Sequence, residues 1–198
     1  VSKKNEEVLD LLINRSVDVN VISEREPPLM TAVRAGNLSL TTKLIDTGAH
    51  LNTEWNTSTA LRDCIRAVPF SKAIMTLLIE RGADLDHTRE DIAETSTFFG
   101  PATQPTPLLL AIARDCFVAT DLLLRHRADV NLTPTLTTWP KRYTPLMMSI
   151  ALLTRNLSIM QRILAAAPDV NAKGLKGWTA LHFAAHRDCN LVDILLTH

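Results

Sequence analysis

The sequence predicts an all-α solenoid of helix-turn-helix units that are linked by β-hairpin-like loops, two of them extended. Three observations predict this fold class. Five segments end alike, five begin alike, and a Leu/Ile-rich amphipathic run precedes each of the shared endings. Internal similarity of this kind indicates a stack of units, each of which buries its apolar stripe only against its neighbours.

The shared endings and the runs before them define the second helix of each unit. The endings are SVDVN at Asn20, GAHLN at Asn52, GADLD at Asp86, RADVN at Asn131 and APDVN at Asn171. We expect helices in the runs before them, at 8–14, 41–46, 74–80, 119–125 and 160–165, and in a sixth run at 191–198. Glycine suits the left-handed residue that ends such a helix, as at Gly48 and Gly82.

The shared openings define the first helix of each unit. They are PPLM from Pro27, TALR from Thr59, TPLL from Thr106, TPLM from Thr144 and TALH from Thr179. A proline directly after the opening threonine suits the first turn of a helix, where its missing N–H costs nothing. Helices of about 8–10 residues are too short to be stable alone, which again favours stacking.

The unit resembles the ankyrin repeat, which is about 33 residues long. The resemblance lies in the order of its parts: Thr-Pro-Leu opening a short helix, a turn, a second helix with Leu-Leu, and then Gly-Ala-Asp-Val-Asn. The most faithful copies are Pro28–Asn52 and Gly177–Leu196. The resemblance implies one domain over 1–198, and from the opening valine and the end on Leu-Leu-Thr-His, without a polar tail, we expect a piece of a larger protein. Its predicted parts are an N-terminal half-repeat at 1–20, repeats at 21–52, 53–86, 87–131 and 132–171, and a truncated C-terminal repeat at 172–198.

Composition limits the function classes. The 198 residues are 46% hydrophobic and 21% charged, with a net charge of zero, which argues against nucleic acid as the main partner. No apolar run is long enough to span a membrane. Three cysteines, an odd number far apart in sequence, favour a reducing compartment, so we expect an intracellular protein, cytoplasmic or nuclear.

The sequence predicts no enzyme, no metal site and no cofactor. All three cysteines lie in Arg-Asp-Cys triplets, at 62–64, 114–116 and 187–189. The second and third triplets share one register in their repeats, so their cysteines lie roughly 20 Å apart, too far to share a zinc ion. His182 and His186 have metal-ligand spacing, but His182 fills the histidine position of the TxLH motif, which in ankyrin repeats makes hydrogen bonds between units.

Two adjacent hairpins are the main departures from the repeat. From the end of one unit to the opening of the next they measure 20 and 13 residues, whereas the others measure 7 or 8. Long loops in compact domains are usually functional or disordered. Six of the nine aromatic residues lie in hairpin segments, where they are typical of interface anchors: Trp55, Phe98, Phe99, Trp139, Tyr143 and Trp178. For Phe98, Phe99 and Trp139, the alternative is that the rings only fold the long hairpins onto each other or onto the concave helices.

The resemblance also implies a concave groove, lined by the residue after TxLH and those one turn on. In the first two repeats these are the polar Thr31, Arg34, Asp63 and Arg66. The last three repeats place Leu110, Met148 and Phe183 in a row, a predicted apolar strip. Basic residues edge it, namely Arg114, Lys141, Arg142 and Arg187, and His186 and Leu152 also occupy groove positions.

These features predict a monomeric, non-catalytic module that binds a protein or peptide through the groove and the extended hairpins. The ligand is expected to carry apolar anchors and acidic residues. A second interpretation is a structural or autoinhibitory ankyrin segment that packs against another domain of a larger protein. Neither interpretation involves a membrane.

Overall fold

The computed structural model describes residues 18–21, 26–88, 105–133, 143–152 and 157–197. Their contacts divide the chain into two compact units, which we call the N-terminal unit (1–84) and the C-terminal unit (85–198). The prediction of a single domain over 1–198 stays a prediction. No described helix is long and apolar enough to cross a membrane.

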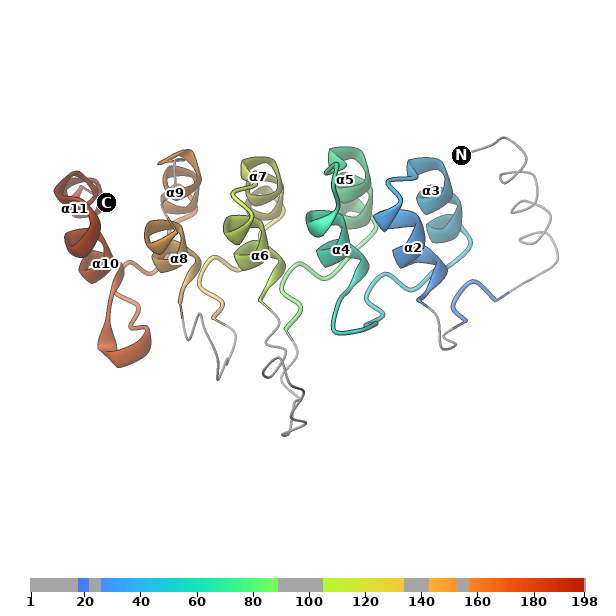
Figure 1. Ribbon diagram of the computed structural model, residues 1–198, viewed down its shortest axis with the longest axis horizontal. Coiled ribbons are helices and arrows are strands. Elements are labelled where there is room, and N and C mark those ends of the chain that lie inside the picture. The colour runs from blue at the N-terminus through green and yellow to red at the C-terminus, as the bar shows by residue number, and fades with distance from the viewer. Residues whose placement is uncertain (1–17, 22–25, 89–104, 134–142, 153–156, 198) are drawn as a thin grey trace. The chain divides into compact units, whose positions relative to one another are not determined.

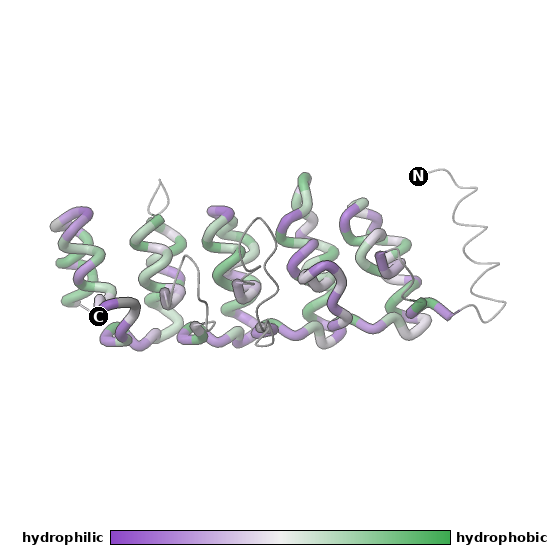
Figure 2. Tube along the Cα trace, turned by 60° about the horizontal axis from the view of Figure 1, so that its bottom comes forward, coloured by the Kyte–Doolittle hydropathy of each residue, from purple (hydrophilic) through white to green (hydrophobic). Residues whose placement is uncertain are grey.

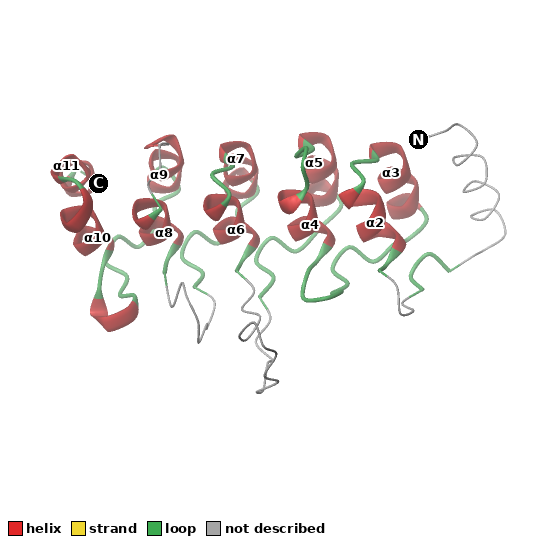
Figure 3. Cartoon of the chain, in the orientation of Figure 1, coloured by secondary structure: helices red, strands yellow, loops and turns green. Residues whose placement is uncertain are grey.

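The described chain consists of helices and loops, without a named strand, as the predicted all-α fold class requires (Figure 3). In the N-terminal unit the helices are α2 (Pro28–Arg34), α3 (Leu38–Asp46), α4 (Ala60–Arg66) and α5 (Lys72–Glu80). In the C-terminal unit they are α6 (Pro107–Ala113), α7 (Phe117–Arg125), α8 (Pro145–Ala151), α9 (Leu157–Leu164), the short 3₁₀ helix η1 (Leu175–Gly177), α10 (Ala180–Arg187) and α11 (Cys189–Leu196).

The helices form antiparallel pairs that stack within each unit (Figure 1). In the N-terminal unit α2 packs against α3 and α4, and α5 packs against α3 and α4. In the C-terminal unit the same pattern joins α6, α7, α8 and α9, and α10 then packs against α8 and α11. Hydrophobic residues concentrate on the helices (Figure 2), which is why each pair needs a neighbour to cover it.

The repeated opening threonine begins the first helix of a pair by capping it. The side chain of Thr106 accepts a hydrogen bond from the backbone N–H of Leu109, and Thr144 does the same for Met147. A side-chain oxygen at this position satisfies one of the helix's unpaired N–H groups. Pro107 and Pro145 follow as the first helical residues, as predicted.

The second helix of each pair ends at a left-handed residue. Gly48 and Gly82 have φ values of 98° and 91°, which confirms their predicted role. Arg127 and Ala167 occupy the same position with φ of 68° and 52°, a conformation that costs a side chain more than it costs glycine. The stacking contacts therefore impose this backbone shape even where glycine is absent.

The Asn or Asp that closes each repeat ties its hairpin to the next hairpin. The Oδ1 atom of Asn52 accepts a hydrogen bond from the N–H of Asp84 at 2.8 Å, and Asn131 accepts from Asp169 at 2.8 Å. Asn20 and Asp86 make the equivalent bonds, to the N–H groups of His50 and Asp129. The repeated ending thus forms a ladder of side-chain acceptors, in which one Asn or Asp joins each pair of consecutive hairpins within a unit.

An ion pair joins second helices in the C-terminal unit. Arg162 of α9 donates to Asp121 of α7 at 2.7 Å, and Arg125 contacts the other carboxylate oxygen at 2.8 Å. Burial alone would raise the pKa of Asp121, but the hydrogen bonds from the two arginines outweigh it and lower the pKa below its ordinary value. The carboxylate is therefore ionised at neutral pH and links adjacent repeats.

Candidate functional site

An open cavity of about 330 Å³ lies in the N-terminal unit and forms the best-defined candidate site. We call it the N-terminal cavity. Its walls come from α2, from α4 and from the hairpin before α4. The side chains that give it chemical character are Glu26, Arg34, Trp55, Ser58, Asp63 and Arg66.

Two arginines reach the cavity because they hold the same register in successive repeats. Arg34 is the last residue of α2 and Arg66 is the last residue of α4. Sequence analysis predicted both as groove residues, together with Asp63, and predicted Trp55 as an interface aromatic. The structure brings these four residues to one cavity.

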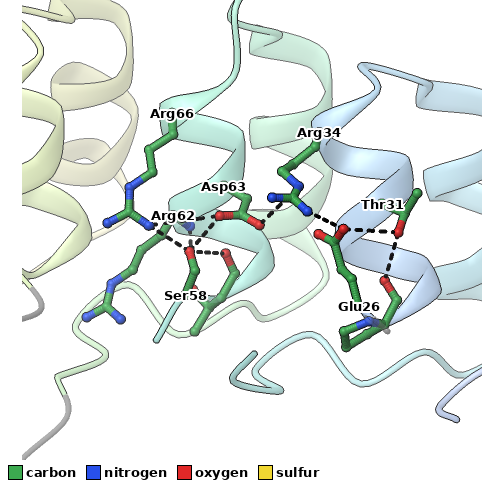
Figure 4. Close-up of polar contacts among 9 residues, drawn as sticks. Glu26, Thr31, Arg34, Ser58, Arg62, Asp63 and Arg66 are labelled. Atoms are coloured by element: carbon green, nitrogen blue, oxygen red, sulfur yellow. Dashed lines mark hydrogen bonds and ion pairs between the residues drawn. The ribbon is translucent and has the colours of Figure 1, made fainter. Parts of the chain in front are cut away.

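Two carboxylates hold the arginines in place (Figure 4). Arg34 forms an ion pair with Glu26, which also accepts a hydrogen bond from the hydroxyl of Thr31 at 3.3 Å. Asp63 lies 3.9 Å from the Nε of Arg34 and 3.9 Å from an Nη of Arg66. One carboxylate therefore lies within reach of both guanidinium groups.

Ser58 connects the arginine of α4 to the same carboxylate. Its hydroxyl donates to Asp63 at 2.6 Å and accepts from Arg66 at 2.9 Å. Burial raises the pKa of Asp63 above its ordinary value, although the Ser58 hydrogen bond and the two arginines act in the opposite direction. The hydrogen bond to Glu26 raises the pKa of Arg34. Both guanidinium groups remain cationic at neutral pH.

A tight turn positions Trp55 at the rim. Trp55 and Ser58 exchange two backbone hydrogen bonds of 2.9 Å, and the two residues between them, Asn56 and Thr57, have φ of 45° and 66°. Positive φ at both central residues is the geometry of a type I′ hairpin turn, in which a β-branched residue such as Thr57 is uncommon. Backbone outliers of this kind persist only where surrounding structure supports them.

Arg62 supplies part of that support by contacting the backbone of the turn. Its side chain is completely buried, and its Nη1 donates to the carbonyl of Thr57 at 3.5 Å. Burial lowers the pKa of Arg62 to about 10, which still leaves the guanidinium charged at neutral pH. The turn that carries Trp55 therefore has one of its carbonyl groups hydrogen-bonded to a buried guanidinium group.

A second group of predicted residues meets in the C-terminal unit. The ring of Phe183 contacts Tyr143 edge-on, with centroids 5.0 Å apart, and contacts Trp178 in the same way at 5.2 Å. Trp178 also stacks on His182 and lies beside His186. We call this group the aromatic cluster. Because these rings contact one another, part of their surface packs the hairpin residue Trp178 against α10.

The other predicted site residues of the C-terminal unit are dispersed. Leu110 and Met148 are only 8% and 3% exposed, so most of their surface packs inside the stack and not on an open strip. Arg114 is exposed at the end of α6. Arg187 donates to the carbonyl of Ala151 in α8. Five predicted residues lie outside the described part of the chain: Phe98, Phe99, Trp139, Lys141 and Arg142.

His182 makes its hydrogen bonds inside its own repeat, which corrects the expectation of a bond between repeats. Its Nδ1 accepts from the backbone N–H of Thr179 at 3.2 Å and lies 2.9 Å from the Thr179 hydroxyl. The ring thereby caps α10, because His182 lies three residues after the N-cap residue Thr179, where a side chain can reach back to the N-cap backbone. Among the described residues no three His, Cys, Asp or Glu side chains form a metal-binding group.

Asp188 differs in backbone conformation from the residues at the same position in two earlier repeats. In sequence it stands with Asp115 where Gly36 stands in an earlier repeat, and Asp115 and Gly36 both have positive φ, at 52° and 67°. Asp188 has φ of −162° instead and caps α11 by accepting from the N–H of Asn190. Asp115 therefore contributes to the turn between its two helices through a left-handed backbone, whereas Asp188 contributes through its side chain, which caps α11.

Sequence reasoning missed Glu26, Ser58 and Arg62. A usable signal existed for Arg62, because the same position holds Met30, Leu109 and Met147 in other repeats, all buried. A lone charge at a position that is otherwise apolar indicates a local polar network. Glu26 and Ser58 lie outside the helices and carry no comparable signal.

Replacing Asp63 with asparagine is expected to change how the stability of the N-terminal unit depends on pH. The folded-state pKa of Asp63 is raised above 3.8, so the folded chain keeps this proton to higher pH than the unfolded chain does. Wild-type stability should therefore fall, through this group, as the pH rises through that window. Asparagine removes this loss and can still accept from Ser58.

The measurement is the free energy of opening of α4, from amide hydrogen exchange in both proteins across the acidic range. The advantage of Asp63→Asn over wild type should grow as the pH rises from the ordinary aspartate value. An advantage that shrinks with rising pH would contradict the raised pKa.

Comparison with protein families agrees with the architecture. The family model described as ankyrin repeats, in three copies, matches residues 1–89 and 108–198, which is nearly the whole chain. No curated protein gives a match to this sequence.

Proposed function

Because the chain belongs to the ankyrin-repeat family, whose repeats are generally protein-interaction modules, we propose that it binds a protein through a peptide segment at the N-terminal cavity. The single observation that supports this proposal is the composition of that cavity. It is open, it measures about 330 Å³, and it combines an aromatic ring with two guanidinium groups. Trp and Arg are the residues most often found where binding energy concentrates in protein interfaces.

The proposal is for a non-catalytic role. The polar side chains of the cavity bind one another in a network of ion pairs that fixes their positions. A preorganised surface of this kind loses little conformational entropy when a ligand binds. The aromatic cluster and the extended hairpins are proposed as secondary contact surfaces, and the hairpin residues Phe98, Phe99 and Trp139 stay predictions.

The test is selection of peptides from a phage-displayed library of random 12-residue sequences on the immobilised full chain. Selected peptides are then synthesised and titrated against wild type, Trp55→Ala and Phe117→Ala. We expect Trp55→Ala to weaken binding by about tenfold or more, as for an interface anchor. Phe117→Ala, which removes an exposed aromatic ring from α7 of the other unit, should leave the affinity within about twofold.

Thermal unfolding of each variant provides the folding control. A library that yields no binder above background, or binders that ignore Trp55→Ala, would refute a peptide site at this cavity. That result would favour the second interpretation, in which the chain is a structural segment that packs against another domain.

A further inference from the structure

The charged groups of the N-terminal cavity are not equally accessible. The side chains of Arg34 and Arg66 are 57% and 38% exposed, whereas those of Glu26 and Asp63 are 16% and 7% exposed. The carboxylates thus lie beneath the guanidinium groups and orient them. A ligand that enters the cavity meets cations first.

The exposed guanidinium groups retain hydrogen-bonding capacity. Each guanidinium has five N–H donors in a fixed fork that matches a carboxylate. In the described structure Arg34 donates to Glu26, and Arg66 donates to Ser58. The remaining donors are available to a ligand, and they converge because both groups lie 3.9 Å from the same Asp63.

These charges are not a general requirement of the repeat. The last residue of α2, of α4 and of α10 is arginine, but the last residue of α6 and of α8 is alanine, at Ala113 and Ala151. The repeat fold does not require a cation at this position. The arginine pair therefore needs an explanation beyond stability.

A hydrogen-bond acceptor lies beside the donors. The Oε1 atom of Glu26 is buried and has no hydrogen-bond partner among the described residues. A buried acceptor without a donor is costly, so a ligand that brings an N–H group is favoured there. An acidic residue in an extended peptide offers both a carboxylate and a backbone N–H.

We propose that the N-terminal cavity recognises an acidic residue of the bound peptide, with its carboxylate on the guanidinium groups of Arg34 and Arg66 and a peptide N–H directed to Glu26. This inference rests on the proposed function and adds the chemistry of the ligand. Trp55, at the rim, would contact an apolar neighbour of the acidic residue. The competing ligand is a basic side chain that binds Glu26 and Asp63.

The experiment uses the same peptide library on wild type and on the double variant Arg34→Ala/Arg66→Ala. Alanine already occupies this position in α6 and α8, so the helices should tolerate it. Wild type should select Asp or Glu at a fixed distance from an apolar residue. The double variant should lose that enrichment and bind the wild-type-selected peptide at least tenfold more weakly.

A peptide with Gln in place of the selected Glu gives the matching test on the ligand side. It should bind wild type about tenfold more weakly than the Glu peptide, and the two peptides should bind the double variant within about twofold of each other.

Two results separate this inference from the proposed function. Peptides that depend on Trp55 but are enriched in Lys or Arg, or show no charge preference, would overturn acidic recognition and leave peptide binding intact. Peptides that do not depend on Trp55 would refute the proposed function itself. Thermal unfolding of the double variant excludes misfolding as the cause of lost binding.

Discussion

Replacing Leu146 with alanine is expected to lower the free energy of unfolding of the C-terminal unit by about 3 kcal/mol, the usual cost of emptying a fully buried leucine site. Leu146 is 0% exposed because α8 packs between α6 and α10. Leu181 holds the same register in α10 but is 41% exposed. The same change there should cost about 1 kcal/mol, because less apolar surface is lost from the packed interior.

Urea denaturation followed by circular dichroism, with hydrogen exchange to assign the loss to the C-terminal unit, measures both costs. Leu108→Ala in α6, which is also 0% exposed, serves as a second buried control and should resemble Leu146→Ala. Equal costs at Leu146 and Leu181 would show that α10 is packed as closely as the inner helices, contrary to the structure.

Replacing Arg62 with methionine is expected to stabilise the N-terminal unit by about 1 kcal/mol while weakening peptide binding at the N-terminal cavity. Substituting a buried charge by an apolar residue of similar volume is often neutral or stabilising. Methionine already fills this position, buried, at Met30 and Met147. The variant loses the hydrogen bond to the Thr57 carbonyl, and with it support for the turn that carries Trp55.

The loss of affinity should be about fivefold, which corresponds to about 1 kcal/mol, the net value of a typical hydrogen bond. Thermal unfolding and titration of a Trp55-dependent peptide measure the two effects in one preparation. Leu109→Met, at the same position in the C-terminal unit, is the control and should leave the affinity unchanged. A variant that loses stability and retains full affinity would show that Arg62 holds the helix stack and not the turn.

The fold could be predicted from the sequence because its determinants repeat. An opening threonine in four of the five repeats, the apolar run of the second helix and the closing Asn or Asp recur in the same order along the chain, and the structure assigns each a local task. Thr106 caps a helix, Leu123 is buried, and Asn131 accepts from the next hairpin. Each task depends on near neighbours, so the pattern alone predicts it.

The candidate site was less predictable because it depends on where repeats differ. Arg34, Asp63 and Arg66 were predicted from their register and Trp55 from its place in a hairpin, and the structure places them together. Leu110 and Met148 share that register, yet packing buries them. Whether a groove position is open depends on the side chains of adjacent repeats and hairpins, which register does not specify.

The contribution of Arg62 could not be read from sequence for a related reason. The support that Arg62 gives to the turn depends on the distance from its guanidinium group to the carbonyl of Thr57 and on the left-handed backbone of that turn. Both are properties of three-dimensional packing. The Arg-Asp-Cys triplet at 62–64 does not share the register of the other two triplets, but Asp63 lines the N-terminal cavity and Arg62 contacts the turn beside it.

The ladder of closing Asn and Asp side chains has a mechanical consequence. Within each unit these bonds join consecutive hairpins, so a force that pulls the hairpins apart loads two side-chain bonds at the step from Asn20 and one at each of the other steps. Bonds loaded in series rupture one at a time, at the weakest step first, whereas bonds loaded side by side share the tension. Stretching a unit should therefore release its repeats successively, in small extensions, and the chain should behave as a soft spring that recoils when the tension is removed.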